Sequence, residues 1–344
     1  VIEAINRFQP EINRDQRFAN SLIERQVILG YYFQGRGHLN SDNQSGTLPF
    51  PILPVKEAGL EGLPFIKALG YGANIETLQN NAIAGGFFDN PSSDSDGVIR
   101  SVPLLTEFEG NLYESLSLAV VKTYLNEFFI EPVLTLDEDG QSIGMEAIKI
   151  GNLSIPVNDQ AVALVPYLGS QGSFRYYSAT DILNREIPAE ILQGKIVLVG
   201  TTSPGLQDLR NTPVQGVYPG VEVHANLIAG MLDERIMYKP SYSAAIELVQ
   251  LLGIGIILSV LLPLLSAMSS ILITLGLGFG VVLYNLNAWE TGLVLPIASV
   301  LVLIAIIFTI HMAYGFLTEA RMKLTITKTF GQYVPPEVVD ELAD

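Results

Sequence analysis

The sequence contains no cysteine, one tryptophan and only three histidines among its 344 residues. The absence of cysteine excludes disulfide bonds, cysteine-ligated zinc and thiol catalysis. Three histidines, one of which lies in a long apolar run, do not predict a histidine-rich metal site. We therefore expect this chain to hold no metal and no cofactor.

Positive charge is also scarce, since 19 Lys and Arg residues stand against 35 Asp and Glu residues. Up to residue 243 the chain carries 28 acidic and 16 basic side chains, a formal net charge of −12. Nucleic-acid phosphates require a basic surface, so nucleic acid is excluded as a partner. The same acidity does not favour binding to anionic lipid surfaces.

Charge almost disappears in the last third of the chain, where Glu247 and Glu290 are the only charged residues across more than seventy positions. Three apolar runs occupy residues 244–265, 267–286 and 293–317. Each approaches or exceeds the roughly 20 residues that a helix needs to cross the hydrocarbon of a bilayer. Three such runs in succession favour transmembrane helices over buried core helices.

The basic residues after the third run predict the orientation. Arg321, Lys323 and Lys328 follow it, and positive residues favour the cytoplasmic side of a membrane. An odd number of spans places the two flanking regions on opposite sides. We therefore expect residues 1–240 to be extracytoplasmic, residues 318–344 to be cytoplasmic and the lipid bilayer to be a partner.

Gly276 and Gly280 in the second run form a G-x-x-x-G pair. This spacing allows helices to approach closely. It is consistent with packing against neighbouring spans of the same chain or with packing between two chains, and both interpretations stay open. His311, near the inner end of the third run, is interpreted as a hydrated structural histidine.

Residues 1–240 have the pattern of a mixed-sheet α/β domain. Apolar runs predict strands, and amphipathic periodicity predicts helices. We expect strands at residues 26–33, 81–88, 98–105, 151–157, 161–167 and 194–200, helices at 112–129, 180–183 and 219–232, and loops at 35–54 and 201–218. The run at 194–200, closed by glycine, is typical of a buried strand in an α/β sheet.

A strand followed by a loop and a helix places ligands at the carboxyl end of the strand. Hydroxyl, carboxylate, guanidinium and imidazole groups follow the predicted strand at 194–200. The candidate ligand-binding residues are Thr201, Thr202, Asp208, Arg210 and His224. Loop capping by the first four, and packing of His224 between its helix and the sheet, remain open as alternatives.

Asp94 and Asp96, followed by Gly97, resemble part of a calcium-binding loop. In the EF-hand pattern, positions one and twelve would be Ser92 and Pro103, which cannot supply the required carboxylates. A tight Asp-Gly turn is the favoured interpretation, and a cation site of another type is the alternative. The chain has no P-loop, H-E-x-x-H or G-x-S-x-G motif, so no catalytic residue is predicted.

Several short segments, in order and spacing, resemble the second type of the CHASE family of extracytoplasmic sensor domains from about residue 20 to residue 240. They are Asp-Gly-Val-Ile-Arg at 96–100, Tyr-Glu-Ser-Leu at 113–116, Gly-Lys-Ile-Val-Leu-Val-Gly-Thr at 194–201 and Tyr-Pro-Gly-Val-Glu-Val-His-Ala-Asn at 218–226. The resemblance implies a sensor followed by three spans and a cytoplasmic output domain. It also implies that a span and the first part of the sensor precede this sequence, and it supplies no ligand.

Residues 329–342, Thr-Phe-Gly-Gln-Tyr-Val-Pro-Pro-Glu-Val-Val-Asp-Glu-Leu, resemble the lead-in to class III nucleotide cyclase domains. This resemblance implies a bacterial inner-membrane receptor whose full-length form converts ATP to cyclic AMP with Mg or Mn. It also implies a homodimer, because such active sites form between two catalytic domains. Coupling of the sensor to a histidine or Ser/Thr kinase is one alternative, and a solute-binding or transport subunit is another.

Overall fold

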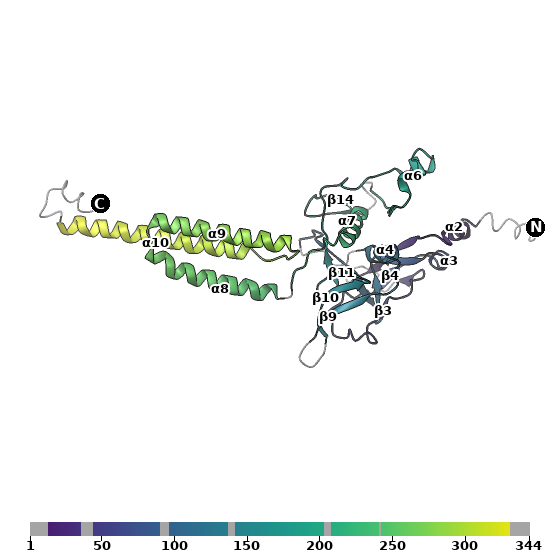
Figure 1. Cartoon of the computed structure of the whole chain (residues 1–344), viewed down its shortest axis with the longest axis horizontal. Coiled ribbons are helices and arrows are strands. Elements are labelled where there is room, and N and C mark those ends of the chain that lie inside the picture. Colours follow the sequence, from purple (N-terminus) through teal and green to yellow (C-terminus); the bar gives the residue numbers. More distant parts are fainter. Residues whose placement is uncertain are drawn as a thin grey trace, which may run out of the picture. The chain divides into compact units, whose positions relative to one another are not determined.

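The computed structural model describes residues 13–35, 44–89, 96–136, 142–202, 208–240 and 242–330. The chain divides into two compact units, Val1–Tyr238 and Lys239–Asp344. The first, the N-terminal unit, combines helices with several small sheets, and the second, the helical unit, contains three long apolar helices (Figure 1). The predicted fold class, a mixed α/β domain followed by three helices able to span a membrane, is confirmed.

The N-terminal unit alternates short strands with short helices. Its described helices are α2 (Arg14–Leu22), α3 (Glu76–Gln79), α4 (Leu116–Tyr124), α5 (Ala179–Leu183), α6 (Ala189–Leu192) and α7 (Gly220–Leu232). Its described strands are β1 (Ile28–Gln34), β2 (Gln44–Ser45), β3 (Leu53–Pro54), β4 (Gly70–Gly72), β5 (Ala84–Phe87), β6 (Ser101–Pro103), β7 (Leu105–Phe108), β8 (Asn111–Glu114), β9 (Glu131–Leu136), β10 (Ser142–Ile150), β11 (Leu153–Pro156), β12 (Val162–Leu164), β13 (Leu209–Arg210) and β14 (Tyr218–Pro219).

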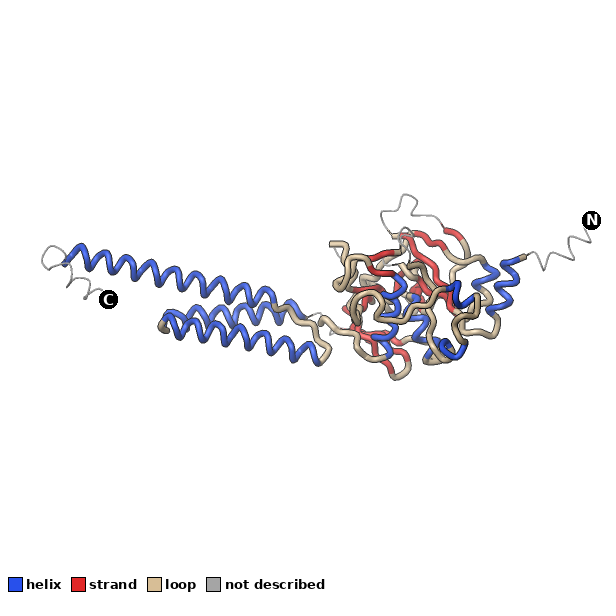
Figure 2. Tube along the Cα trace, turned by 90° about the horizontal axis from the view of Figure 1, so that it is seen from above, coloured by secondary structure: helices blue, strands red, loops and turns tan. Residues whose placement is uncertain are grey.

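The largest described sheet is mixed and has the strand order β2-β4-β1-β5. Strand β1 pairs in parallel with β5 and antiparallel with β4. Two three-stranded antiparallel sheets have the orders β3-β8-β7 and β11-β10-β9, and β6 pairs with β12. Figure 2 shows the short strands of this unit in red and the helices between them in blue.

Helix α4 packs against strands β5 and β1 and against helix α7. Ser115 caps its N-terminus by accepting a hydrogen bond from the N–H of Leu118 (3.3 Å). Gly86 in β5 allows the close approach, since a Cβ atom there would lie 2.5 Å from Leu116 Cα. A side chain at position 86 would therefore push α4 away from the sheet.

Two clusters of buried side chains hold the N-terminal unit together. The larger one includes Leu104, Leu118, Ile148 and Leu227, so it joins the sheets to helices α4 and α7. The smaller one is aromatic and contains Tyr31, Phe33, Phe87, Phe108 and Tyr113. Burial of such apolar side chains is the dominant stabilising contribution to a domain of this size.

Several predicted elements of the N-terminal unit are present with altered bounds. Strand β1 overlaps most of the predicted strand at 26–33, β5 lies inside 81–88, and α5 and α7 match the predicted helices at 180–183 and 219–232. The predicted strands at 151–157 and 161–167 contain β11 and β12, which pair with β10 and β6 respectively. The predicted loop at 35–54 contains β2 and β3.

The helix predicted at residues 112–129 is wrong at both ends. Its first residues form strand β8, which pairs with β7, because Glu109 and Gly110 adopt positive φ and turn the chain into a hairpin. Helix α4 then begins at Leu116 and ends at Tyr124. Asn126, with φ of 57°, follows it in the left-handed conformation that asparagine tolerates.

The buried strand predicted at residues 194–200 is also wrong. These residues belong to no strand, and Val199 is 91% exposed. A strongly β-forming run becomes a strand only where a neighbouring strand supplies hydrogen bonds. Among the described residues no strand pairs with this segment; instead Gly200 lies against the Val221 side chain of α7.

The helical unit contains α8 (Ser243–Leu261), which continues into the short helix η1 (Leu262–Leu264), α9 (Ala267–Glu290) and α10 (Ala298–Phe330). All three helices are long and apolar enough to cross a membrane. Helix α10 packs against both α8 and α9. Its 33 residues extend about 50 Å at 1.5 Å per residue, more than the ~30 Å of hydrocarbon.

Candidate functional site

Helix α7 is the centre of the polar network in the N-terminal unit. Three of its residues, Glu222, His224 and Asn226, are polar and buried. Glu222 and Asn226 are four residues apart and share one side of the helix, whereas His224 lies between them on another side. Since a buried polar group needs partners, each of these side chains identifies a contact that α7 makes with a distant part of the chain.

The His224 ring joins α7 to α4 and to the end of β5. Its Nδ1 atom lies 2.8 Å from the Ser117 hydroxyl oxygen, and its Nε2 atom lies 3.2 Å from the Phe88 carbonyl oxygen. A carbonyl only accepts, so Nε2 carries the proton and donates it, and Nδ1 accepts from Ser117. Burial lowers the pKa of His224 to about 4, so the ring is neutral at pH 7.

Asp208 and Arg210 lie beside His224 around a small cavity of about 20 Å³. The Arg210 guanidinium is 3.5 Å from the Asp208 carboxylate, and the Asp208 carbonyl accepts the N–H of Gly220 at the start of α7 (2.8 Å). Burial raises the pKa of Asp208, and Arg210 opposes this rise. The cavity has room for about one water molecule, so a larger ligand would need α7 or its neighbours to move.

The opposite side of α7 holds an exposed segment. The Glu222 carboxylate accepts the N–H of Gly172 through both oxygens (3.0 and 3.1 Å), the N–H of Phe174 (3.4 Å) and the hydroxyl of Tyr176. Asn226 accepts the N–H of Leu168 (2.9 Å). Two buried side chains therefore hold the stretch 168–176 on the surface of the helix.

We call residues 167–202 the strap. None of its residues is buried, although it includes α5 and α6 and ends in the apolar run at 194–200. Leu183 is 82% exposed, and Figure 1 shows α6 set apart from the strands. Besides the contacts with Glu222 and Asn226, the Gln171 N–H donates to Gln215 Oε1 (3.0 Å), and Tyr167 and Leu198 pack against the larger core cluster. Because the strap buries little apolar surface, these few contacts hold it on the domain.

Comparison of the sequence with known families identifies the larger part of the chain. A family model described as the CHASE2 domain matches residues 3–264. The chain belongs to the CHASE2 family. No curated protein and no solved structure matches the chain.

CHASE2 domains are extracytoplasmic sensor domains, and the match ends at Leu264, the end of the first apolar helix. The sensor is thus continuous with a helix able to cross a membrane. Residues 233–242 are the link between α7 in the CHASE2 domain and α8. Helix α7 and the first span are therefore joined by a short segment of chain.

The structure brings together three of the five candidate ligand-binding residues. Asp208, Arg210 and His224 line the same cavity in the CHASE2 domain. Thr201 is exposed and Thr202 is half-buried, and neither lines this cavity. Ligand binding by these five residues stays a prediction.

Asp94 lies outside the described residues. Asp96 accepts the N–H of Val98 (3.0 Å) and pairs with Arg100 at 2.8 Å, and hydrogen bonding to Arg100 lowers the pKa of Asp96 to about 2. Gly97 has a φ of 74°, which glycine adopts readily in a turn. No group of three or more metal-ligating side chains occurs among the described residues of the CHASE2 domain.

Sequence reasoning missed Glu222, Asn226 and Ser117 as site residues. A signal for the first two was present, since they lie four residues apart, on one side of a helix that is apolar apart from these two residues and His224. Such a pair predicts a buried polar contact. The partners of Glu222, which are N–H groups and a hydroxyl of the strap, lie 46 or more residues away in sequence and could not be inferred from local pattern.

Proposed function

We propose that this protein is a transmembrane signal receptor, in which the CHASE2 domain senses an extracytoplasmic event. The observation that carries the proposal is the CHASE2 match over residues 3–264, followed directly by further helices that could cross a membrane. The proposed location is the bacterial inner membrane. The basic residues Arg321 and Lys323 on the far part of α10 support a cytoplasmic position for the tail.

The geometry of α7 supports a route for the signal. The strap is held by two side chains on one side of α7, and the cavity near Asp208, Arg210 and His224 lies on the other side. An unknown ligand that displaced the strap or opened the cavity would change the contacts of α7. A ligand shifts such an equilibrium only through different affinities for the two states.

The length and continuity of helix α10 support the proposal that the signal passes along this helix to the other side of the membrane. It is continuous from Ala298 to Phe330 and longer than the hydrocarbon layer, so one helix both crosses and extends beyond it. A rigid helix transmits rotation or displacement without an intervening flexible joint. We propose that this extension leads into the output domain.

For the output we propose adenylate cyclase activity in the full-length gene product, with ATP and Mg or Mn bound by that domain. The support is the resemblance of residues 329–342 to the lead-in of class III cyclases. Most of those residues lie outside the described part of the chain. We assign no catalytic group within residues 1–344.

The test compares the full-length gene product with the chain ending at Asp344, both in native membranes. Cyclic AMP formation from ATP with Mg or Mn is measured. We expect activity in the full-length protein and none in the shorter chain. ATP-dependent phosphorylation without cyclic AMP would replace the cyclase with a kinase output, and solute uptake without either product would replace the receptor with a transport subunit.

A further inference from the structure

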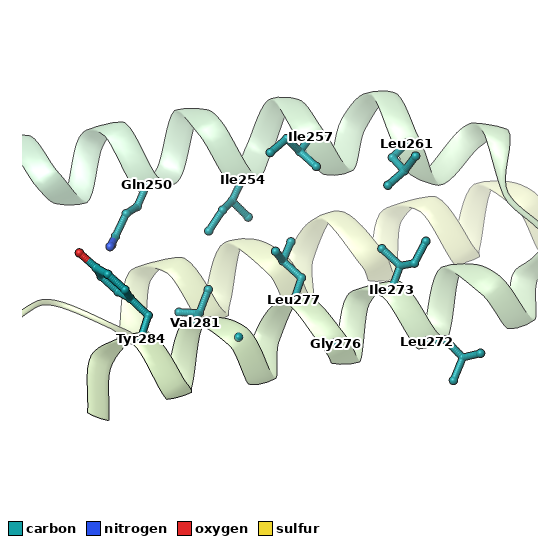
Figure 3. A pocket seen from close by; sticks show the side chains of 11 residues that line it. Gln250, Ile254, Ile257, Leu261, Leu272, Ile273, Gly276, Leu277, Val281 and Tyr284 are labelled. Atoms are coloured by element: carbon teal, nitrogen blue, oxygen red, sulfur yellow. The ribbon is translucent and has the colours of Figure 1, made fainter. Parts of the chain in front are cut away.

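The groove between α8 and α9 in the helical unit offers few hydrogen-bonding groups. It has a volume of about 770 Å³ and is lined mostly by Ile and Leu side chains (Figure 3). Gly276 and Gly280 also line it, and a Cβ atom added to either would meet nothing within 4 Å. Among the described residues of its lining, only Gln250 and Tyr284 have polar side chains. Because fixed polar groups give a site its specificity, the groups able to select a polar ligand lie instead on α7.

The segment 168–174 of the strap is bound to the domain through its main chain. Its donors to side chains of the domain are the N–H groups of Leu168, Gln171, Gly172 and Phe174. The acceptors belong to three residues, Asn226, Gln215 and Glu222, at distances from 2.9 to 3.4 Å. Hydrogen bonds to main-chain N–H groups do not depend on the side chains of the bound segment. Proteins that bind extended peptides obtain affinity in this way.

The two acceptors on α7 are buried and held in place by the domain itself. Asn226 is 0% exposed, and its NH2 group donates to the Tyr218 hydroxyl (2.8 Å) and to the Glu222 carbonyl oxygen (2.7 Å). Both amide hydrogens are thereby used, so the side-chain oxygen is left to accept from the strap. The Glu222 side chain is also buried. Acceptors that are fixed before binding lose little freedom on binding, so they form a preorganised site.

The strap is a tethered occupant of this site. Tyr167 at its beginning packs against the larger core cluster, and its hydroxyl donates to the Ile99 carbonyl oxygen (2.9 Å). The residues that follow are not buried, and Tyr176 is 43% exposed although its hydroxyl donates to Glu222. A short tether gives a segment an effective concentration on the order of millimolar. A free segment with the same contacts must therefore compete with the strap.

We propose that the side of α7 that carries Glu222 and Asn226 is a binding site for an extended peptide segment of an extracytoplasmic partner, and that residues 168–176 are the intramolecular competitor for this site. The partner segment offers main-chain N–H groups to the same acceptors and displaces the strap. This inference rests on the proposed receptor function and names its ligand class. The exchange takes place on the helix that a short segment joins to the first span.

The test uses a fluorescent synthetic peptide of residues 167–177, Tyr-Leu-Gly-Ser-Gln-Gly-Ser-Phe-Arg-Tyr-Tyr. Its binding to residues 1–344 in lipid nanodiscs is measured by fluorescence anisotropy. Gly172→Pro in the protein removes one N–H donor of the strap, and proline cannot adopt the φ of 95° found there. The strap then leaves while the acceptors stay intact. We expect the peptide to bind this variant at least tenfold more tightly than the unchanged chain.

Adding Glu222→Gln to the Gly172→Pro chain should weaken peptide binding at least tenfold, because one acceptor oxygen is lost. Hydrogen exchange identifies the state of each variant: peptides of residues 168–176 exchange faster, whereas peptides of β10 stay protected. Equal binding to the unchanged chain and to Gly172→Pro overturns the proposal. So does the absence of binding to a Gly172→Pro chain whose strap is released and whose core is protected.

Three modified peptides test the mode of recognition on the Gly172→Pro chain. N-methylation at Gly172 and Phe174 removes two donors and should abolish binding. Tyr176→Phe in the peptide should weaken binding several-fold, whereas Tyr177→Phe, the matched control, should not change it. Undiminished binding of the N-methylated peptide contradicts main-chain recognition. Displacement of the peptide by ethylammonium at equal concentration would assign the site to small cations and also overturn the proposal.

Failure of this inference can be distinguished from failure of the proposed function. Peptide binding is measured on residues 1–344 and needs no output domain. The absence of peptide binding therefore leaves the cyclic AMP test of the full-length protein unaffected. The absence of cyclic AMP in that test likewise leaves a measured peptide affinity in place.

Discussion

Glu114 and Glu222 are both buried carboxylates in the CHASE2 domain, but their partners differ. Glu114 at the end of β8 receives the Lys122 ammonium group of α4, at 2.9 Å from each oxygen. Glu222 receives two N–H groups and a hydroxyl, all from the strap, and no ion-pair partner of it is observed among the described residues.

The difference separates a fixed part of the domain from a releasable one. Burial raises the pKa of Glu114, and Lys122 opposes that rise, so this pair is an interior charge pair whose members depend on each other. The donors to Glu222 belong to a segment with no buried residue. When that segment leaves, water can satisfy both the donors and the carboxylate, so opening costs little more than the bonds themselves.

Removing the cation beside Glu114 should cause the largest loss of stability. Lys122→Met leaves a carboxylate buried without its partner, and we expect about 3–5 kcal/mol of lost stability in the N-terminal unit. The measurement is pulse proteolysis in urea on chains held in membranes. Lys67→Met is the control, because Lys67 of the Lys67–Glu107 pair is largely exposed and the pair should contribute less than about 1 kcal/mol. Equal losses in both variants would contradict the distinction.

Lowering the pH should have the next largest effect on stability, through protonation of His224. Its pKa of about 4 in the folded protein is below the usual ~6.5, so the unfolded state binds the proton more tightly. The stability that neutral His224 contributes is therefore complete above about pH 6.5 and is lost as the pH falls toward 4, by up to about 1.4 kcal/mol per unit.

The same proteolysis assay, repeated from pH 7 to pH 4, checks this prediction. His224→Gln removes the titrating group, so the difference between the two chains isolates the histidine from the carboxylates that titrate below about pH 5. We expect the difference to change progressively as the pH falls. A difference that does not change with pH would show that the ring is already charged or exposed in the folded domain.

Releasing the strap should have a smaller and local effect. Glu222→Gln removes the negative charge and replaces one of the two acceptor oxygens by an NH2 group, which cannot accept the hydrogen bond of the Gly172 N–H or of the Tyr176 hydroxyl at that position. We expect a loss of about 1–3 kcal/mol for closing the strap. Hydrogen exchange of peptides covering residues 168–176 should accelerate, while peptides of β10 stay protected. Glu190→Gln on exposed α6 makes the same charge change and should leave exchange unaltered. Faster exchange throughout the unit would mean that Glu222 belongs to the fixed core.

Removing one donor gives the smallest change. Tyr176→Phe deletes the hydroxyl that donates to Glu222 and should cost about 0.5–1.5 kcal/mol. Exchange in residues 168–176 should rise by several-fold, less than in Glu222→Gln. The neighbouring Tyr177→Phe leaves the Glu222 contacts intact and is the control. An effect as large as that of Glu222→Gln would place most of the attachment in the hydroxyl alone.

Local pattern predicted the elements whose formation depends on local forces. Helix α7 and strand β1 were predicted from hydrophobic pattern, and the three apolar helices from length and composition. In each case the deciding quantity, apolar periodicity or transfer of side chains to hydrocarbon, belongs to a few consecutive residues.

Predictions from local pattern were wrong where contacts with residues far away in the sequence determine the secondary structure. Residues 194–200 have the composition of a buried strand but are mostly exposed, since a strand exists only through hydrogen bonds to another strand. Residues 112–114 fit a helix but pair with β7. The candidate site was predicted as Thr201, Thr202, Asp208, Arg210 and His224, of which the structure brings together the last three. Glu222 and Asn226 were not recognised.

The sequence by itself determined the division into an acidic α/β domain and three apolar helices, because charge and hydropathy are sums over many residues. Only the tertiary structure decided that His224 bonds Ser117 and Phe88, that Glu222 holds the strap and that Gly276 and Gly280 line an open groove. Those contacts depend on how helices and sheets that are far apart in the sequence pack together, and local sequence patterns do not show which elements will be neighbours.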